Sequence, residues 1–169
     1  HDRRPVIRIL LECGANPNIT NNRGRSPLHK ALSAEAAELL IGHGAEVNKT
    51  DVANKTPLFV ATELDRREVI KHLLSLGADP NSIAKRGRFP LHEARSGNAA
   101  EILIEYKADI NARTSNGETP LLLATKHDRH SVIQVLLDKE ASARIPGPFK
   151  RSPLHETQSP EAAKSLIDK

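Results

Sequence analysis

The sequence predicts an all-α solenoid, which is a stack of similar helical repeats. A short phrase of a capping residue, proline and leucine recurs along the chain, with its prolines at Pro27, Pro57, Pro90, Pro120 and Pro153. The spacing of these prolines alternates between about 30 and about 33 residues. A repeat length of about 33 residues is typical of solenoids, in which no unit can bury its apolar face without its neighbours.

Each repeat is predicted to open with a first helix. In four repeats the residue before proline has a hydroxyl group, whose oxygen can accept a hydrogen bond from a free N–H group of the helix. Proline suits the first helical position because it has no N–H to leave unpaired. We therefore expect Ser26, Thr56, Thr119 and Ser152 to be N-cap residues, whereas Phe89 cannot accept such a bond.

A second helix is predicted from apolar residues at helical spacing, such as those between Val69 and Leu74. Asp65 stands just before this pattern and Glu68 lies three residues later, which is the spacing of a capping box. Asp2 and Asp128 hold the equivalent place in other repeats. We expect these aspartates to cap their helices. The core is expected at the helix leucines, namely Leu58, Leu73, Leu91, Leu103, Leu121 and Leu136.

The second helix is expected to end at a residue with left-handed backbone, which glycine adopts readily. Gly14, Gly44 and Gly77 stand there in three repeats. Lys107 and Glu140 replace glycine in two others, at a cost of ~1–2 kcal/mol each.

A finger loop then leads to the next repeat. Its return turn contains a residue that tolerates a positive φ, namely Gly24, Asn54, Gly87 or Gly117. The last finger, residues 144–149, contains two prolines, which have no N–H group to donate. We expect this finger not to form a paired hairpin.

Together these features resemble the ankyrin repeat. Ser26 to Ala31 and its copies are similar to the Thr-Pro-Leu-His-x-Ala signature of that family, and Ala78 to Asn81 is similar to its Gly-Ala-Asp-Val-Asn stretch. The resemblance covers the whole chain and implies helix-turn-helix units with a finger loop or β-hairpin. It implies a single domain, residues 1–169, with complete repeats at 26–55, 56–88, 89–118 and 119–151 and partial repeats at 1–25 and 152–169. Because the chain starts and stops within a repeat and has no methionine, we expect a segment of a longer protein.

The repeats alternate between a long and a short form. A shift by one pair of repeats places Ser33 to Ala37 on Ser96 to Ala100, and Asp65 to Arg67 on Asp128 to His130. The short form lacks three residues between its two helices, which is nearly one turn at ~3.6 residues per turn. We expect a notch at every second repeat along one edge of the solenoid.

Charge and cysteine content restrict the setting in which the chain works. The net charge of +4 and the pI near 9.4 favour acidic partners without requiring nucleic acid. The single cysteine, Cys13, cannot form an intramolecular disulfide, which favours a reducing compartment. No apolar run approaches the ~18 residues of a membrane span, and the start shows no signal-peptide pattern. We expect an intracellular protein, cytoplasmic or nuclear, or a secreted effector in a host cytosol.

The histidines do not indicate a metal site or catalysis. His29, His92 and His155 recur at every second repeat as part of the repeat motif, which favours a structural role. Equivalent residues of stacked helices also lie ~10 Å apart, too far to share one ion. The chain has no Gly-x-x-x-x-Gly-Lys phosphate loop. We expect no enzyme activity, no cofactor and no metal.

The resemblance implies that the fingers and first helices line a concave face that binds another protein. Basic residues concentrate there, so the expected partner carries an acidic segment. Val60 and Leu123 of the first helices are also expected to contact it. The candidate partner-binding residues are Arg23, Arg25, Lys30, Lys49, Lys55, Lys85, Arg86, Arg88, Arg95, Arg113, Lys126, Phe149, Lys150 and Arg151. We expect Arg25 and Arg88, which lie two repeats apart, each to meet a separate acidic group on an extended partner, and Arg151 to belong to the same stripe.

Other functions stay open at this point. The segment could recruit substrates or target a larger enzyme or effector, or serve as a scaffold with no ligand of its own. Binding of nucleic acid or another polyanion is less favoured, because the chain has no Trp, one Tyr and three Phe on which bases could stack. The basic residues could also be solvated side chains that the duplication copied.

Overall fold

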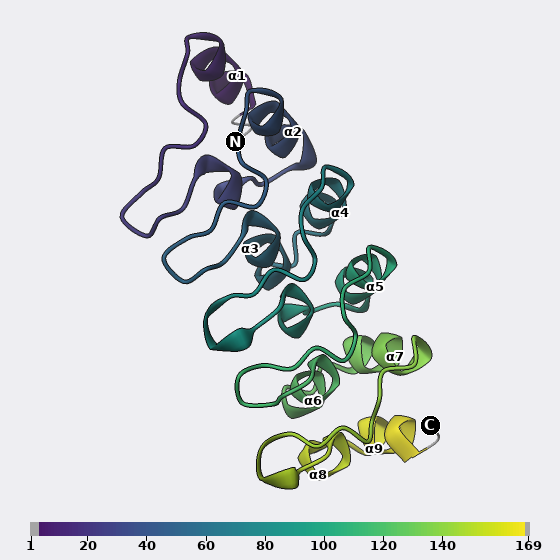
Figure 1. Ribbon diagram of the computed structural model, residues 1–169. Coiled ribbons are helices and arrows are strands. Elements are labelled where there is room, and N and C mark those ends of the chain that lie inside the picture. The colour runs from purple at the N-terminus through teal and green to yellow at the C-terminus, as the bar shows by residue number, and fades with distance from the viewer. Residues whose placement is uncertain (1–3, 168–169) are drawn as a thin grey trace.

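A computed structural model of the protein describes residues 4–167, which fold into stacked pairs of antiparallel helices (Figure 1). These residues contain no strand, and the one isolated bridge joins Ala84 and Arg88 in a finger. The prediction of an all-α solenoid is therefore confirmed. In chain order the elements, with η for one-turn 3₁₀ helices, are α1 (Arg4–Glu12), η1 (Pro27–Lys30), α2 (Ala34–Gly42), α3 (Pro57–Glu63), α4 (Arg67–Ser75), η2 (Lys85–Gly87), η3 (Pro90–Glu93), α5 (Gly97–Glu105), α6 (Pro120–Lys126), α7 (His130–Asp138), η4 (Pro148–Lys150), α8 (Pro153–Glu156) and α9 (Pro160–Ile167).

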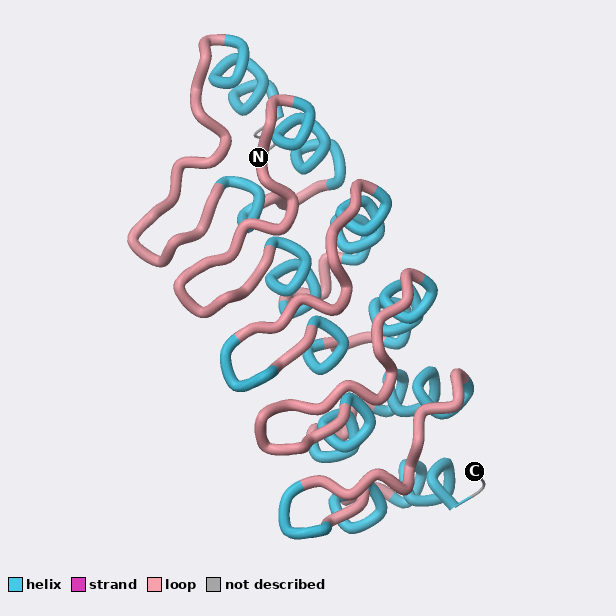
Figure 2. Tube along the Cα trace, viewed as in Figure 1, coloured by secondary structure: helices cyan, strands magenta, loops and turns pink. Residues whose placement is uncertain are grey.

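The helices form two layers. The second helices α1, α2, α4, α5, α7 and α9 follow one another along one edge of the stack, and each packs on the next. The first helices η1, α3, η3, α6 and α8 form the inner layer, and the fingers project beyond them (Figure 2). This arrangement places all fingers and all first helices on one side of the molecule.

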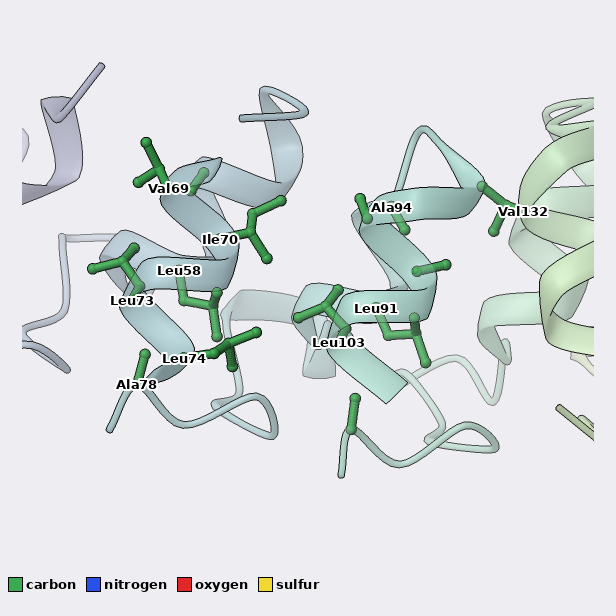
Figure 3. Close-up of a cluster of buried hydrophobic side chains, with 14 of the residues drawn as sticks. Leu58, Val69, Ile70, Leu73, Leu74, Ala78, Leu91, Ala94, Leu103 and Val132 are labelled. Carbon is green, nitrogen blue, oxygen red and sulfur yellow. The ribbon is translucent and has the colours of Figure 1, made fainter. Parts of the chain in front are cut away.

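The core lies between these two layers. Figure 3 shows Leu58 beside Leu73 and Leu91 beside Leu103, each pair joining a first helix to a second helix. All six leucines predicted as core residues are at most 2% exposed. At the two ends of the stack apolar side chains stay exposed, among them Val6 and Leu10 of α1 and Ile167 of α9.

The difference between long and short repeats comes from the first helix. In the long form, α3 and α6 have seven residues each, whereas η1 and η3 of the short form are single 3₁₀ turns of four residues. After η1 and η3 the backbone becomes extended at Ala31 and Ala94, with ψ of 126° and 127°. The chain therefore leaves the first helix about one turn early in every short repeat.

An arginine from the following long repeat bonds to the end of two of the shortened helices, η1 and η3. Arg66 Nη1 donates to the carbonyl of Ala31 over 2.8 Å, and Arg129 Nη1 donates to the carbonyls of Ala94 and His92 over 2.8 and 3.3 Å. The last carbonyls of a helix have no partner within it and need a donor from elsewhere. Each long repeat thus supplies hydrogen bonds that the preceding short repeat lacks.

Replacing Arg129 with alanine is expected to lower the free energy of unfolding by about 1–3 kcal/mol, because the carbonyl of Ala94 would lose its charged donor while partly buried. Arg67→Ala, at an exposed site on α4, is the matched control and should change stability by less than ~0.5 kcal/mol. Urea unfolding followed by circular dichroism measures both. Equal losses in the two variants would show that the Arg129 contacts add no stability.

The predicted aspartate caps are wrong at Asp65 and Asp128. Both residues have left-handed backbone, with φ of 51° and 54°, and the N-cap positions belong to Arg66 and Arg129. The chain turns sharply between the two helices of a long repeat, and aspartate tolerates the positive φ that this turn requires. Asp65 instead accepts a hydrogen bond from the Ser96 hydroxyl over 2.6 Å. The equivalent prediction for Asp2 lies outside the described residues.

The turn residues predicted from the sequence do have positive φ. Glycine or its replacement at the end of the second helix is left-handed, including Lys107 at 69° and Glu140 at 64°. The last finger forms no paired hairpin, as expected, since the one isolated bridge among residues 4–167 joins Ala84 and Arg88. A single hydrogen bond, from the Gly147 N–H to the Arg151 carbonyl over 2.8 Å, closes this finger. The two prolines flank Gly147, so they do not remove the donor that closes this finger.

Candidate functional site

The finger face, as we name it, consists of the fingers at residues 21–25, 51–55, 84–88, 114–118 and 147–151 together with the first helices. Each finger is closed by one backbone hydrogen bond, such as Asp51 N–H to the Lys55 carbonyl at 2.9 Å. Neighbouring fingers are also joined, for example by Val52 N–H to the Arg23 carbonyl at 3.0 Å. The fingers therefore form a connected surface rather than separate loops.

Asparagine side chains link the bases of successive fingers. Asn18 donates to the Gly44 carbonyl over 2.8 Å and accepts from the Glu46 N–H over 2.9 Å. Asn48 and Asn81 make the equivalent pair of contacts with the next repeats. These bonds hold the repeats at a fixed spacing along the finger face.

The buried histidines also connect neighbouring repeats. His92 Nδ1 accepts from the Phe89 N–H over 3.2 Å, and its Nε2 lies 3.1 Å from the Glu118 carbonyl in the next finger. His29 makes the same two contacts with Ser26 and Lys55. The structural interpretation of these two histidines is thus confirmed, whereas His155 is exposed. Within residues 4–167, no three His, Cys, Asp or Glu side chains come close enough together to hold a metal ion.

Many of the candidate basic residues are already paired with carboxylates of the chain itself. Arg25 Nε lies 3.0 Å from Asp51 Oδ2, with side chains only 18% and 2% exposed. Although burial alone would raise the pKa of Asp51, the N–H of Lys55 and the Arg25 guanidinium lower it below its ordinary value. The other pairs are Lys49–Glu46, Lys55–Glu63, Arg88–Glu93, Lys126–Glu118 and Arg151–Glu156, at 2.8 to 3.4 Å.

These ion pairs change the interpretation of the arginines that recur at every second repeat. Arg25, Arg88 and Arg151 were expected to contact acidic groups of a partner, whereas in the structure each of them is paired with a carboxylate of its own chain. Arg88 Nε approaches Glu93 at 2.9 Å without an aligned hydrogen bond, so this contact is electrostatic. The three arginines therefore hold fingers and first helices in place, and their charges are largely compensated.

A second group of candidate residues is exposed and without an ion pair or side-chain hydrogen bond among residues 4–167. It consists of Arg23, Lys30, Lys85, Arg86, Arg95 and Lys150. Arg113 differs, because its Nη2 donates to the Pro146 carbonyl of the last finger over 3.1 Å. The free positive charge of the finger face therefore lies mainly at the finger tips and at the ends of the short first helices.

Two apolar candidates do not reach the surface. Val60 and Leu123 are 2% and 3% exposed, so the expectation that they contact a partner is wrong. Their helices α3 and α6 each pack between the first helices of the repeats on both sides, which buries this position. Lys30, at the equivalent place in the one-turn η1, is exposed.

Phe149 is the exposed aromatic candidate, with 96% of its surface accessible at the tip of the last finger. Its backbone is left-handed, with φ of 55°. The exposure that a contact role for Phe149 requires is present, and that role stays a prediction. Sequence reasoning missed Arg66 and Arg129, whose hydrogen bonds reach across repeats. The recurrence of Asp-Arg at every second repeat was visible and could have indicated them.

A bilayer-crossing helix is absent from the described part of the chain, since none of its helices has the length and apolarity that crossing requires.

Comparison with known proteins agrees with the repeat architecture described above. A family model described as "Ankyrin repeats (3 copies)" matches residues 1–84 and 77–147. Neurogenic locus notch homolog protein 1 of Xenopus tropicalis is 34% identical over 137 residues, or 78% of this chain, and the human protein of the same name is 34% identical over 131 residues, or 73% of this chain. The chain spans about 5% of the length of these relatives.

Among solved structures, the ankyrin repeat domain of Bcl-3, a member of the IkappaB protein family, superposes with a TM-score of 0.84. The alignment covers 97% of this chain and 77% of that chain, at 24% sequence identity. At this identity the likeness concerns the fold alone.

Proposed function

This chain belongs to the ankyrin-repeat family, and we propose that its finger face binds an acidic segment of a protein partner. Ankyrin repeats are protein–protein interaction modules. The observation that carries the proposal is the group of exposed, unpaired cations on the finger face, since charged groups without internal partners are available to a ligand. The role is binding rather than catalysis, in a single domain divided into repeats as the sequence predicts.

The setting follows from the same proposal. An exposed Cys13 without a disulfide partner supports an intracellular location, cytoplasmic or nuclear. A module of this kind can also recruit substrates for a larger enzyme or effector of which it is a segment. Polyanion binding is the second candidate function, favoured by the same free cations, and the experiment below separates the two.

The finger cations are tested by changing Arg23, Arg86 and Lys150 together to Glu. The probe is a fluorescent polyglutamate peptide of about 20 residues, which spans several repeats at ~3.3 Å per residue. We expect its affinity, measured by fluorescence anisotropy, to fall at least about tenfold, and the affinity of the unchanged protein to fall with added salt. Thermal stability should stay nearly unchanged, because none of the three side chains has an ion pair or side-chain hydrogen bond within the described residues 4–167.

The control carries the same change of charge on the second-helix layer, at Arg8, Lys71 and Lys164. All three side chains are exposed. If this control weakens peptide binding as much as the finger variant does, the finger face is not the binding surface. Tighter binding of a single-stranded oligonucleotide than of polyglutamate would favour the polyanion function instead.

A further inference from the structure

The tip of the last finger holds a large apolar side chain in an unfavourable state. Phe149 and Lys150 follow one another with φ of 55° and 59°, and the phenyl ring is almost entirely in water. Left-handed backbone costs a residue with a side chain ~1–2 kcal/mol, and the exposed ring gains nothing from burial. In the equivalent finger two repeats earlier, Arg86 and Gly87 take these places, so the fold needs neither Phe149 nor Lys150. The left-handed backbone therefore belongs to the finger itself, and what distinguishes this tip is the exposed phenyl ring.

A groove of about 590 Å³ lies directly beside this ring. It runs between α6 and the last finger, and its apolar part is lined by Leu122, Pro148 and Phe149. The volume falls within the range of ~300–1,000 Å³ that is typical of small-ligand pockets. At its rim Lys126 and Arg151 are each paired with a carboxylate that also lines the groove, Glu118 at 3.4 Å and Glu156 at 2.9 Å.

The wall of the groove is held in place by close packing. A Cβ atom on Gly147 would collide with Leu122 Cδ2, so only glycine allows the finger to lie this close to α6. The finger is also closed by the Gly147–Arg151 backbone bond and tied to the preceding finger through Arg113. The groove is therefore preformed, which lowers the entropic cost of binding.

Positive charge extends from Lys126 along the end of α6. The pKa of His127 is lowered, first by burial and then by the cations Arg129, Lys126 and Arg88, against the smaller opposing effect of Glu93. Arg95 is exposed, and its charge also acts on Arg129. Within the groove Glu118 and Glu156 offset Lys126 and Arg151, so an anionic group next to it would meet excess positive charge only on the side of the exposed Arg95.

The earlier copy of this site shows a closed alternative. There Lys55 lies 5.2 Å from the centre of the Phe59 ring and donates to both Glu63 oxygens over 3.0 and 2.9 Å. In the later copy the charges are exchanged, because Glu118 replaces Lys55 and Lys126 replaces Glu63, and the pair is looser at 3.4 Å. The Lys126 side chain is 52% exposed, against 23% for Lys55. Of the two equivalent ion pairs, the earlier one, Lys55–Glu63, is therefore the more covered, and the later one, Glu118–Lys126, leaves its lysine open to solvent.

We propose that the open groove takes a large apolar side chain of an extended partner segment, and that an acidic residue next to it in that segment contacts Lys126 and the cations beyond. This inference rests on the proposed function and adds the partner's chemistry and register. A protein segment is favoured over nucleic acid because the apolar wall has one aromatic ring rather than a series of stacking platforms.

The test compares two fluorescent peptides that differ at one position. The first is an acidic decamer with one central leucine, and the second carries serine at that position. We expect the leucine peptide to bind at least about fivefold more tightly, since a buried leucine gains ~1.5–3 kcal/mol over an exposed one and the groove stays partly open. The ratio of the two dissociation constants reports on the groove. The affinity that remains in the serine peptide reports on the charge of the finger face.

Phe149→Asn is the main variant, because asparagine tolerates left-handed backbone and Asn54 has φ of 56° at the tip of another finger. The ratio should fall to about one while the melting temperature stays equal or rises. Arg86→Asn is the matched control at the equivalent tip, and it should leave the ratio unchanged.

The outcomes separate this inference from the proposed function. A ratio near one in the unchanged protein, or a ratio that survives Phe149→Asn, would overturn the groove while leaving the acidic-segment function in place if both peptides still bind. If neither peptide binds more tightly than a version with glutamine in place of glutamate, both proposals fail. Tighter binding of a single-stranded oligonucleotide of equal length would overturn the choice of a protein partner.

Discussion

Replacing Leu103 with alanine is expected to lower the free energy of unfolding by about 2–5 kcal/mol. Leu103 is fully buried in α5, which packs against α4 on one side and α7 on the other. Because a solenoid has only contacts between neighbouring repeats, a cavity at its centre weakens both interfaces at once. Equilibrium urea unfolding measures the loss.

Leu32→Ala is the control for this prediction. Leu32 follows the short helix η1 and is 63% exposed, so its truncation should change stability by less than ~0.5 kcal/mol. A loss below ~0.5 kcal/mol at Leu103 would mean that the central repeats do not stack as described.

The fold could be predicted because its decisive signals are local. Proline and a hydroxyl residue start a helix within a few positions, and Gly77 or Gly44 ends one, so repeating them at a regular distance specifies the pairs of helices. The positive φ of Lys107 and Glu140 was also predictable, since the repeat sets the backbone at these positions whatever the side chain.

The sequence could not show which side chains of one repeat contact the next repeat. The Arg25–Asp51 pair joins residues 26 positions apart, and the Arg66 contact with Ala31 spans 35. Neither follows from the spacing along the chain, because both depend on the distance and rotation between stacked repeats. For this reason the charge of the candidate site was overestimated at Arg25 and Arg88, and the caps at Asp65 were misassigned.

The groove illustrates the same limit at the level of function. The sequence identified Phe149 as an aromatic candidate, but the cavity beside it depends on how the last finger packs against α6, where Gly147 lies close to Leu122 and Lys126 is more exposed than Lys55. The exchange of charges between the two equivalent ion pairs is visible in the aligned repeats, although its consequence for exposure is visible only in the structure.

Lowering the pH from about 6.5 to about 4 is expected to remove about 3 kcal/mol of stability through His92 alone. Burial lowers the pKa of His92 to about 4, whereas in the unfolded chain it keeps its ordinary value near 6.5. Between these values the unfolded chain binds more protons, so stability is present above pH 6.5 and falls as the pH approaches 4. The pKa of His29 is lowered for the same reason, which adds to the effect. Although burial alone would raise the pKa of Asp51, the Lys55 N–H and the Arg25 guanidinium lower it from its ordinary value, so its contribution is lost only at more acidic pH.

The double variant His29→Leu, His92→Leu separates this effect from general acid sensitivity. Leucine occupies the equivalent place in α6 as Leu122, so the fold accepts it, although the hydrogen bonds from the Ser26 and Phe89 N–H groups are lost. We expect the variant to be less stable at pH 7 and nearly independent of pH between 4.5 and 6.5, as measured by urea unfolding at each pH. His155→Leu alters the same motif at an exposed site and should keep the full pH dependence. The double variant could instead lose stability with falling pH as steeply as the unchanged chain. In that case groups other than the two buried histidines control the acid response, and their contacts with the Lys55 and Glu118 carbonyls are not its cause.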